Sequence, residues 1–212
     1  MTRRKTRPAL VLAAALLPPL FASCTRATDR EMRFDVVEAT IPEMQRAMEE
    51  GRVTSRELVE AHLLRIALYE ERVNATIAVN ANALTEAERL DRERADGRIR
   101  GPLHGIPIGL KDNLATAGIT TTLGSKVLAD HVPEEDAEVV KRCRDAGAIF
   151  IGKENLEEFA AGATSNNPHY GAVRNPWGLD HIPGGSSGGG GANVAAGVTF
   201  ASLGTDLGGS LR

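Results

Sequence analysis

The glycine-serine run GGSSGGGG at residues 184–191 limits the folds open to this chain more than any other segment. Such runs usually form flexible linkers between domains. Here the run leads straight into the apolar segment ANVAAGVTFASLG, and the sequence offers no second domain for it to connect. A phosphate-binding loop would end in Gly-Lys followed by Ser or Thr, which is absent. We therefore interpret the run as a glycine-rich turn before a small-residue helix, with free backbone N–H groups.

A second glycine-serine stretch, GTDLGGSLR, occupies residues 204–212. Gly208 and Gly209 allow successive N–H groups to point the same way, and such a nest can hold an oxyanion. Taken alone, this stretch is equally consistent with an ordinary tight turn.

Ser186 lies in GGSSG, which formally matches the G-x-S-x-G nucleophile elbow of α/β-hydrolases. That motif requires a strand directly before the serine. The residues that precede it, RNPWGLDHIP, contain two prolines and are typical of a loop. We therefore reject the elbow interpretation.

Lys111 follows the apolar segment IPIGL, residues 106–110, which predicts a buried strand. A lysine in that place must form an ion pair, extend to solvent or lower its pKa. A single lysine at a strand end is usually solvated or ion-paired, and Asp112 is the obvious partner.

Helix and strand patterns alternate along the chain, which predicts α/β layers with a partly parallel sheet. TIPE at residues 40–43 and TSRE at residues 54–57 are capping boxes that begin two helices. The second helix carries, at helical spacing, Leu58, Ala61, Leu64 or Arg65, and Leu68. The other expected helices cover residues 84–97, 133–147, 155–160 and 190–197, and the expected strands cover 75–79, 106–110, 148–152 and 198–204.

Composition excludes several classes of function. The net charge of −3 gives no electrostatic reason to bind nucleic acid, and the aromatic fraction of 4% argues against stacking on single strands. The histidines show neither metal-ligand spacing nor the context of a catalytic triad. They are His62, His104, His131, His169 and His181.

The first 24 residues are typical of a leader. A basic segment, MTRRKTR, precedes the apolar ALVLAAALLPPLFA, which is too short to span a bilayer as a helix. FASC then places Cys24 after two small residues, an arrangement that resembles a bacterial lipoprotein box. We expect an exported protein anchored to the membrane by a lipid on Cys24. Ordinary signal cleavage, giving a periplasmic or secreted protein, is the alternative.

Together, the lysine and the two glycine-serine stretches resemble the amidase signature family. The resemblance covers roughly residues 40–212, and the motifs occur in the family's order and spacing. They are GPLHGIPIGLKDN, TTLGSKVL, DAGAIFIGKENLEEFA, RNPWGLDHIPGGSSGGGGANVAAG and SLGTDLGGSLR. The resemblance implies an α/β amidase signature fold, with a mixed β-sheet core covered by helices on both faces.

The resemblance also assigns roles to residues. Lys111 matches the catalytic lysine, Ser210 the nucleophile, and Ser186 the bridging serine that follows a cis peptide bond. The N–H groups of Leu207, Gly208, Gly209 and Ser210 match the oxyanion hole, and Ser187, Asp206 and Arg212 match supporting positions. The implied mechanism needs no metal ion or organic cofactor.

The implied function is hydrolysis of carboxylic or peptide amides through an acyl-enzyme, with a small-molecule or peptide amide as substrate. Two alternatives remain: an amidotransferase A-type subunit that acts on aminoacyl-tRNA, and an inactive lipoprotein that binds a ligand at the surface. Ser210 is third from the end of the sequence, whereas members of the family continue well past this motif. We therefore expect residues 25–212 to be the N-terminal part of an amidase domain, and activity to belong to the longer protein.

Overall fold

The computed structural model describes residues 34–212, so the leader and Cys24 lie outside the described residues. The α-helices are α1 (Ile41–Glu49), α2 (Ser55–Val73), α3 (Ala83–Ala95), α4 (Glu138–Asp145) and α5 (Gly188–Ala195). The strands are β1 (Thr76–Val79), β2 (Pro107–Lys111), β3 (Ile149–Glu154), β4 (Asn166–Asn167), β5 (Gly171–Ala172) and β6 (Ser202–Leu203). Two 3-10 turns, η1 (Lys126–Leu128) and η2 (Glu158–Ala160), complete the described elements.

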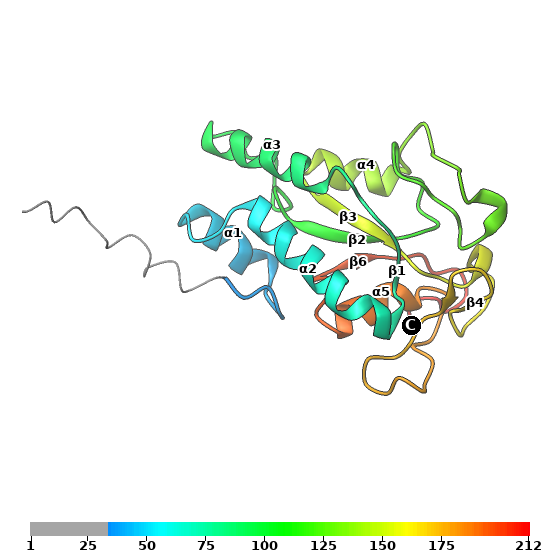
Figure 1. Ribbon diagram of the computed structural model, residues 1–212. Coiled ribbons are helices and arrows are strands. Elements are labelled where there is room, and N and C mark those ends of the chain that lie inside the picture. The colour runs from blue at the N-terminus through cyan, green and yellow to red at the C-terminus, as the bar shows by residue number, and fades with distance from the viewer. Residues whose placement is uncertain (1–33) are drawn as a thin grey trace, which may run out of the picture. The chain divides into compact units, whose positions relative to one another are not determined.

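The main sheet has four strands in the order β1-β3-β2-β6 (Figure 1). β2 runs parallel to both of its neighbours, and β1 runs antiparallel to β3. The sheet is therefore mixed, as the resemblance implied. In the register, Lys111 of β2 pairs with Glu154 of β3, and Leu110 of β2 pairs with Leu203 of β6.

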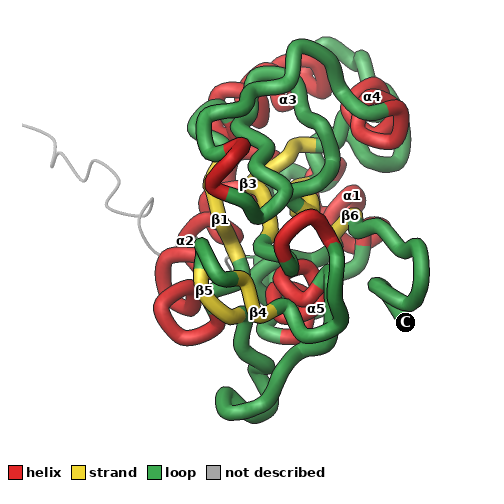
Figure 2. Tube along the Cα trace, turned by 90° about the vertical axis from the view of Figure 1, so that its right-hand side faces the viewer, coloured by secondary structure: helices red, strands yellow, loops and turns green. Residues whose placement is uncertain are grey.

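Helices cover both faces of this sheet because β3 is apolar on both sides. Ile149 and Ile151 pack in a cluster with residues of α2 and α3. Phe150, which points the other way, packs with Val140 of α4 and Leu110 of β2. Successive side chains of a strand point to opposite faces, so one six-residue strand anchors both layers. The two layers can be followed on either side of the sheet in Figures 1 and 2.

The two capping boxes begin helices where the sequence predicted them. Thr40 caps α1 with Glu43, and Thr54 caps α2 with Glu57; in each pair both reciprocal hydrogen bonds are present. The apolar spacing expected along α2 is only partly correct. Its buried positions are Ser55, Leu58, Val59, His62, Ile66 and Val73, whereas Leu64 and Leu68 are exposed.

Three of the expected elements are shorter than predicted. The strand expected over residues 198–204 shrinks to Ser202–Leu203, because Val198 and Thr199 are bound through their N–H groups to Asn193 at the end of α5. The helix expected over residues 155–160 is only the turn η2, within which Phe159 has a positive φ of 53°. A third, the helix expected over residues 133–147, is also shorter, because α4 covers only Glu138–Asp145. The remaining predicted helices and strands are present, with boundaries shifted by a few residues.

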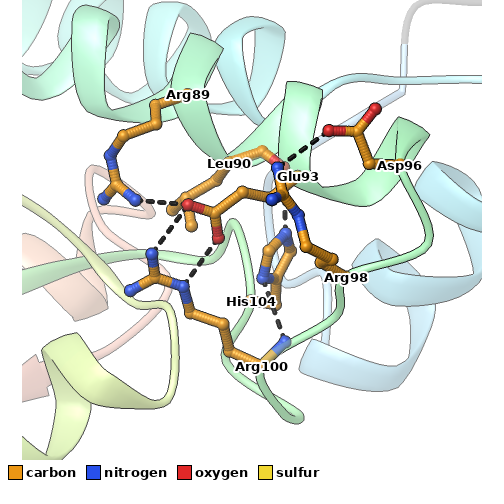
Figure 3. A network of polar contacts seen from close by, with 7 residues as sticks. All are labelled: Arg89, Leu90, Glu93, Asp96, Arg98, Arg100 and His104. Carbon is orange, nitrogen blue, oxygen red and sulfur yellow. Dashed lines mark hydrogen bonds and ion pairs between the residues drawn. The ribbon is translucent and has the colours of Figure 1, made fainter.

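A polar network fixes the loop that leads from α3 into β2 (Figure 3). Glu93 accepts hydrogen bonds from Arg89 at 2.6 Å and from Arg100 at 2.7 Å. Buried His104 donates from Nε2 to the carbonyl of Leu90 at 3.0 Å, and its Nδ1 accepts from the N–H of Arg100 at 3.2 Å. These bonds fix the neutral tautomer of His104 and hold the chain three residues before β2 begins.

No helix within residues 34–212 combines the length and the apolar character that crossing a membrane requires.

Candidate active site

Three segments converge where parallel strands β2 and β6 end. Lys111 is the last residue of β2, and Thr205 to Ser210 follow directly after β6. Ser186 and Ser187 immediately precede α5, and Ser187 is its N-cap residue. The carboxyl ends of neighbouring parallel strands share one edge of the sheet, so residues far apart in sequence meet there.

The structure brings together the three residues to which the resemblance gave the central roles. The Nζ atom of Lys111 lies 2.8 Å from Oγ of Ser186, and that oxygen lies 3.0 Å from Oγ of Ser210. Lys111 and Ser186 are 1% and 0% exposed, whereas Ser210 is half-buried. The peptide bond between Gly185 and Ser186 is cis, as expected. The geometry is that of a proton path from a surface-accessible hydroxyl to a buried amine.

The hydrogen bonds around Lys111 fit a neutral amine. The carbonyl of Thr205, at 3.3 Å, can only accept a bond from Nζ. Ser187 gives its own proton to that same carbonyl at 3.1 Å, so its oxygen accepts the second N–H of Lys111 at 2.8 Å. A neutral amine has two N–H groups and one lone pair. When Lys111 is neutral, this lone pair can accept the hydroxyl proton of Ser186, whose Oγ lies within hydrogen-bond distance of both Nζ and Oγ of Ser210.

Burial also favours the neutral form. Burial lowers the pKa of Lys111 from its ordinary value of 10.5 to about 8, and the charge of Asp206 opposes that shift. The N-terminus of α5 adds partial positive charge close to Nζ, which further disfavours an ammonium. With a pKa of about 8, roughly a tenth of Lys111 is unprotonated at about pH 7 and half at about pH 8.

Lys153 of β3 provides an internal contrast. Its Nζ atom donates to the carbonyl of Leu114 at 2.6 Å, to Oγ1 of Thr116 at 3.2 Å and to Oγ1 of Thr121 at 2.8 Å. Both threonine hydroxyls donate their own hydrogen bonds to backbone carbonyls, so they can only accept from Lys153. Three acceptors that cannot give a proton, together with the carboxylate of Asp112 at 3.6 Å, favour the ammonium form of Lys153. Of the two buried lysines, only Lys153 has a carboxylate beside it, and only Lys111 contacts serine hydroxyls.

Asp112 is not the partner of Lys111, contrary to what sequence proximity suggested. Consecutive residues at a strand end point to opposite sides, and Asp112 lies with Lys153, 3.6 Å from its Nζ. Both side chains are fully buried. Asp112 also accepts from the N–H of Thr122 at 2.9 Å, which fixes the loop that follows Lys111. Burial raises the pKa of Asp112, and its bonds to Thr122 and Lys153 oppose that effect.

Asp206 organises the turn that carries Ser210. Its carboxylate accepts from the N–H of Gly209 at 2.6 Å, from the N–H of Leu211 at 3.1 Å and from Nε of Arg212 at 3.1 Å. The bond from Arg212 is the largest of several that lower the pKa of Asp206. Gly209 has a φ of 119°, which other residues rarely adopt. The supporting positions expected at Asp206 and Arg212 are thus in contact.

The predicted oxyanion donors are only partly available in this conformation. The N–H of Gly209 is bound to Asp206. Among the described residues, the N–H groups of Leu207, Gly208 and Ser210 have no hydrogen-bond acceptor. Leu207 is fully exposed, and Ser210 is half-buried. A substrate carbonyl could accept from these N–H groups without displacing an internal bond.

Sequence reasoning missed four residues of this site: Asn113, Lys153, Glu154 and Thr205. The carbonyl of Thr205 accepts bonds from Lys111 and Ser187, and its hydroxyl accepts from Asn113 at 2.8 Å. The signal for Lys153 and Glu154 was the charged pair that follows the apolar segment AIFIG. Two charges at the end of a buried strand require polar surroundings.

The described histidines that are fully buried serve the fold. His62 donates from Nδ1 to the carbonyl of Val198 at 2.9 Å, and His104 belongs to the network described above. Within residues 34–212, no three His, Cys, Asp or Glu side chains gather as a metal ion would require.

Comparison with known proteins identifies the family. The family described as "Amidase" matches residues 57–212. The chain belongs to the amidase signature family. Over 174 residues it is 47% identical to a glutamyl-tRNA(Gln) amidotransferase subunit from Synechococcus sp. (strain CC9605), a match that covers 82% of this chain and 35% of the relative. The chain thus spans about a third of the length of the curated relatives that it matches.

Solved structures of the family share the fold. The native peptide amidase from Stenotrophomonas maltophilia is 41% identical with a TM-score of 0.73, over 78% of this chain and 35% of that one. The corresponding glutamyl-tRNA(Gln) amidotransferase subunit from Thermotoga maritima is 36% identical with a TM-score of 0.71, over 84% of this chain and 36% of that one. The α/β architecture with a mixed sheet, expected from the sequence, is thereby confirmed.

The buried ion pair between Lys153 and Asp112 allows a test of the charge that we assign to Lys153. Asp112→Asn removes the counter-charge of Lys153 and should lower the free energy of unfolding by roughly 3–5 kcal/mol, the usual cost of leaving a buried charge alone. Denaturant unfolding of the full-length protein measures this. Asp96→Asn is the control: its pair with Arg98 is exposed, and its loss should cost less than about 1 kcal/mol. Equal effects of the two substitutions would contradict our assignment of Lys153 as a buried ammonium.

Proposed function

We propose that the full-length protein hydrolyses the C–N bond of carboxylic or peptide amides, with Ser210 as nucleophile, Ser186 as proton relay and Lys111 as base. The observation that carries this proposal is the chain of contacts in which Oγ of Ser186 lies 3.0 Å from Oγ of Ser210 and 2.8 Å from Nζ of Lys111. A serine hydroxyl attacks poorly until a base takes its proton. The described residues place no histidine in contact with Ser210.

In the first step, Oγ of Ser210 attacks the amide carbonyl carbon. The proton of Ser210 passes to Ser186, while the proton of Ser186 passes to Lys111. The carbonyl oxygen, now negative, accepts from the backbone N–H groups beside Ser210. The protonated Lys111 then returns a proton through Ser186 to the amine, the C–N bond breaks, and an ester on Ser210 remains. Water, deprotonated by the same relay, cleaves that ester to give the carboxylic acid.

The comparisons support this reaction class at a general level. The S. maltophilia protein is named a peptide amidase, and the curated relatives are named amidotransferase subunits. We favour amide hydrolysis because the basic and apolar leader is typical of export, and aminoacyl-tRNA is a cytoplasmic substrate.

The amidotransferase alternative draws on the 47% identity with the Synechococcus protein. The two functions separate by substrate. An amide hydrolase should release ammonia or an amine from peptide amides without any other protein present. An amidotransferase subunit should require its partner subunits and aminoacyl-tRNA. Hydrolysis of a peptide amide by the purified protein favours our proposal.

We further propose that the protein is exported and anchored through a lipid on Cys24. This proposal rests on MTRRKTR, the apolar segment and FASC. Mass spectrometry of the mature N-terminus should find residues 1–23 removed and Cys24 carrying acyl chains. A mature N-terminus without lipid, or cleavage at another bond, would overturn the anchor but leave export in place.

The identity of the nucleophile can be tested by covalent labelling. A fluorophosphonate probe should form its adduct on Ser210 in the full-length protein, and Ser210→Ala should abolish labelling. Ser186→Ala should slow labelling by ~10²–10⁴-fold without moving the adduct, because the proton relay is lost. Peptide mapping locates the adduct.

The control for this labelling is Ser125→Ala, which changes a serine that caps η1 and does not touch Ser210, and the adduct should stay on Ser210. An adduct on Ser186 would reverse the two serine roles. No adduct on either serine would favour a ligand-binding protein without catalysis.

The pH dependence follows from the state of Lys111. The base must be neutral, and its folded pKa is lowered to about 8. The rate of amide hydrolysis should therefore rise with pH through about 8 rather than through the ordinary lysine range. Lys111→Arg should be inactive at every pH because a guanidinium does not deprotonate in proteins. A Lys111→Arg protein that retains full activity would remove Lys111 from the mechanism.

A further inference from the structure

Glu154 is a fully buried carboxyl group that the proposed mechanism does not use. It is the last residue of β3, beside Lys111 in the sheet, and it is 1% exposed. Its contacts are Oγ of Ser202, on β6, and Nδ2 of Asn193, on α5, at 3.3 Å. It therefore touches α5, which begins two residues after Ser186, and β6, which leads into the loop that contains Ser210.

The fold leaves space for this carboxyl group at two glycines. A Cβ atom on Gly109 of β2 would overlap Oε1 of Glu154. A Cβ atom on Gly190 of α5 would lie 3.0 Å from Oε2 of Glu154 and would overlap Oγ of Ser202. Any side chain at either position would collide with the carboxyl group or its partner. We call Gly109, Gly190, Asn193 and Ser202 the Glu154 cradle.

The cradle is connected to the active site through short stretches of chain. Ser202 lies three residues before Thr205, whose carbonyl accepts from Lys111 and from Ser187. Gly190 lies three residues after Ser187 on α5. A change in the distance between β6 and α5 would therefore move Ser210 relative to Ser186.

No cation reaches Glu154 within the described part of the chain. Lys111 points away to Ser186, and Lys153 points to the opposite face with Asp112. The other elements of the surroundings, α5, β6 and β1, contribute no titratable side chain, and the nearby Glu70 of α2 is bound to the N–H of Thr76. A carboxylate without a counter-ion is costly in such a place, so the protonated form is preferred.

We propose that Glu154 is a positioning residue that acts as a neutral acid, tying β6 to α5 so that Ser210 and Ser186 stay within hydrogen-bond reach. This inference rests on the proposed catalytic roles of these serines. Burial supports it, because it raises the pKa of Glu154 from 4.5 to about 7. Ionisation above that pH would place an unpaired charge in the cradle and loosen the link between β6 and α5.

The protonation of Glu154 can be observed without any activity. In the full-length protein labelled with ¹³C-glutamate, infrared spectra at about pH 6 should contain the carbonyl stretch of a protonated glutamate that disappears as the pH rises through about 7. The band should remain in Glu70→Gln, a control that removes the half-buried glutamate nearby. Its absence at about pH 6 in that control would overturn the proposal, even if Glu154 variants fail to fold.

The positioning role predicts a pH-dependent effect on labelling of Ser210. Glu154→Gln keeps the shape of the side chain and stays neutral at every pH, whereas Glu154 of the natural protein ionises. The rate at which Ser210 is labelled in Glu154→Gln, divided by the rate in the natural protein, should therefore grow several-fold as the pH rises from about 6 to about 9. The same ratio for Glu70→Gln should stay constant. A constant ratio for Glu154→Gln would overturn the positioning role while leaving the catalytic triad intact. No labelling of Ser210 in any protein would instead reject the proposed function, and the infrared result would still stand.

Discussion

A buried lysine without a counter-ion is the constraint on which the rest of this structure depends. The Nζ atom of Lys111 is closed off from solvent, and the three oxygens around it belong to two serines and one backbone carbonyl. Such surroundings stabilise an amine better than an ammonium. The two glycine-serine turns are shaped to provide these oxygens, which explains why a glycine-rich run precedes a buried helix instead of joining two domains.

The alternation of a β-strand separates two lysines that would otherwise be equivalent. Lys111 and Lys153 lie on adjacent strands, and burial lowers the pKa of each to about 8. Their side chains nevertheless enter different faces of the sheet. On its face, Lys153 meets the carboxylate of Asp112 and three hydrogen-bond acceptors, which stabilise a protonated amine. On the other face, Lys111 meets the hydroxyl of Ser186, which can donate a proton. The difference between the structural role of Lys153 and the catalytic role that we propose for Lys111 therefore depends on which of their hydrogen-bond partners have protons to donate.

Local patterns predicted the local structure well. Thr40 and Thr54 begin their helices because each capping box needs only residues within one turn. The apolar segments that precede Lys111 and Lys153 form the two central strands for the same reason. The partners of buried charges could not be predicted in this way, since they depend on register between strands. Asp112 was assigned to the lysine next to it in sequence, although strand alternation alone argues against that pair. Glu154 was overlooked because its cradle is built from glycines on two other elements.

The ionisation of Lys111 itself tests the account most directly. Lysine labelled with ¹³C at Cε reports its own protonation in NMR spectra of the full-length protein, and the signal of Lys111 is assigned by its loss in Lys111→Arg. We predict a titration midpoint of about 8 for that signal. A midpoint near 10.5, the ordinary lysine value, would mean that Lys111 is an ammonium throughout the neutral range, and it would contradict the role of this residue as the base.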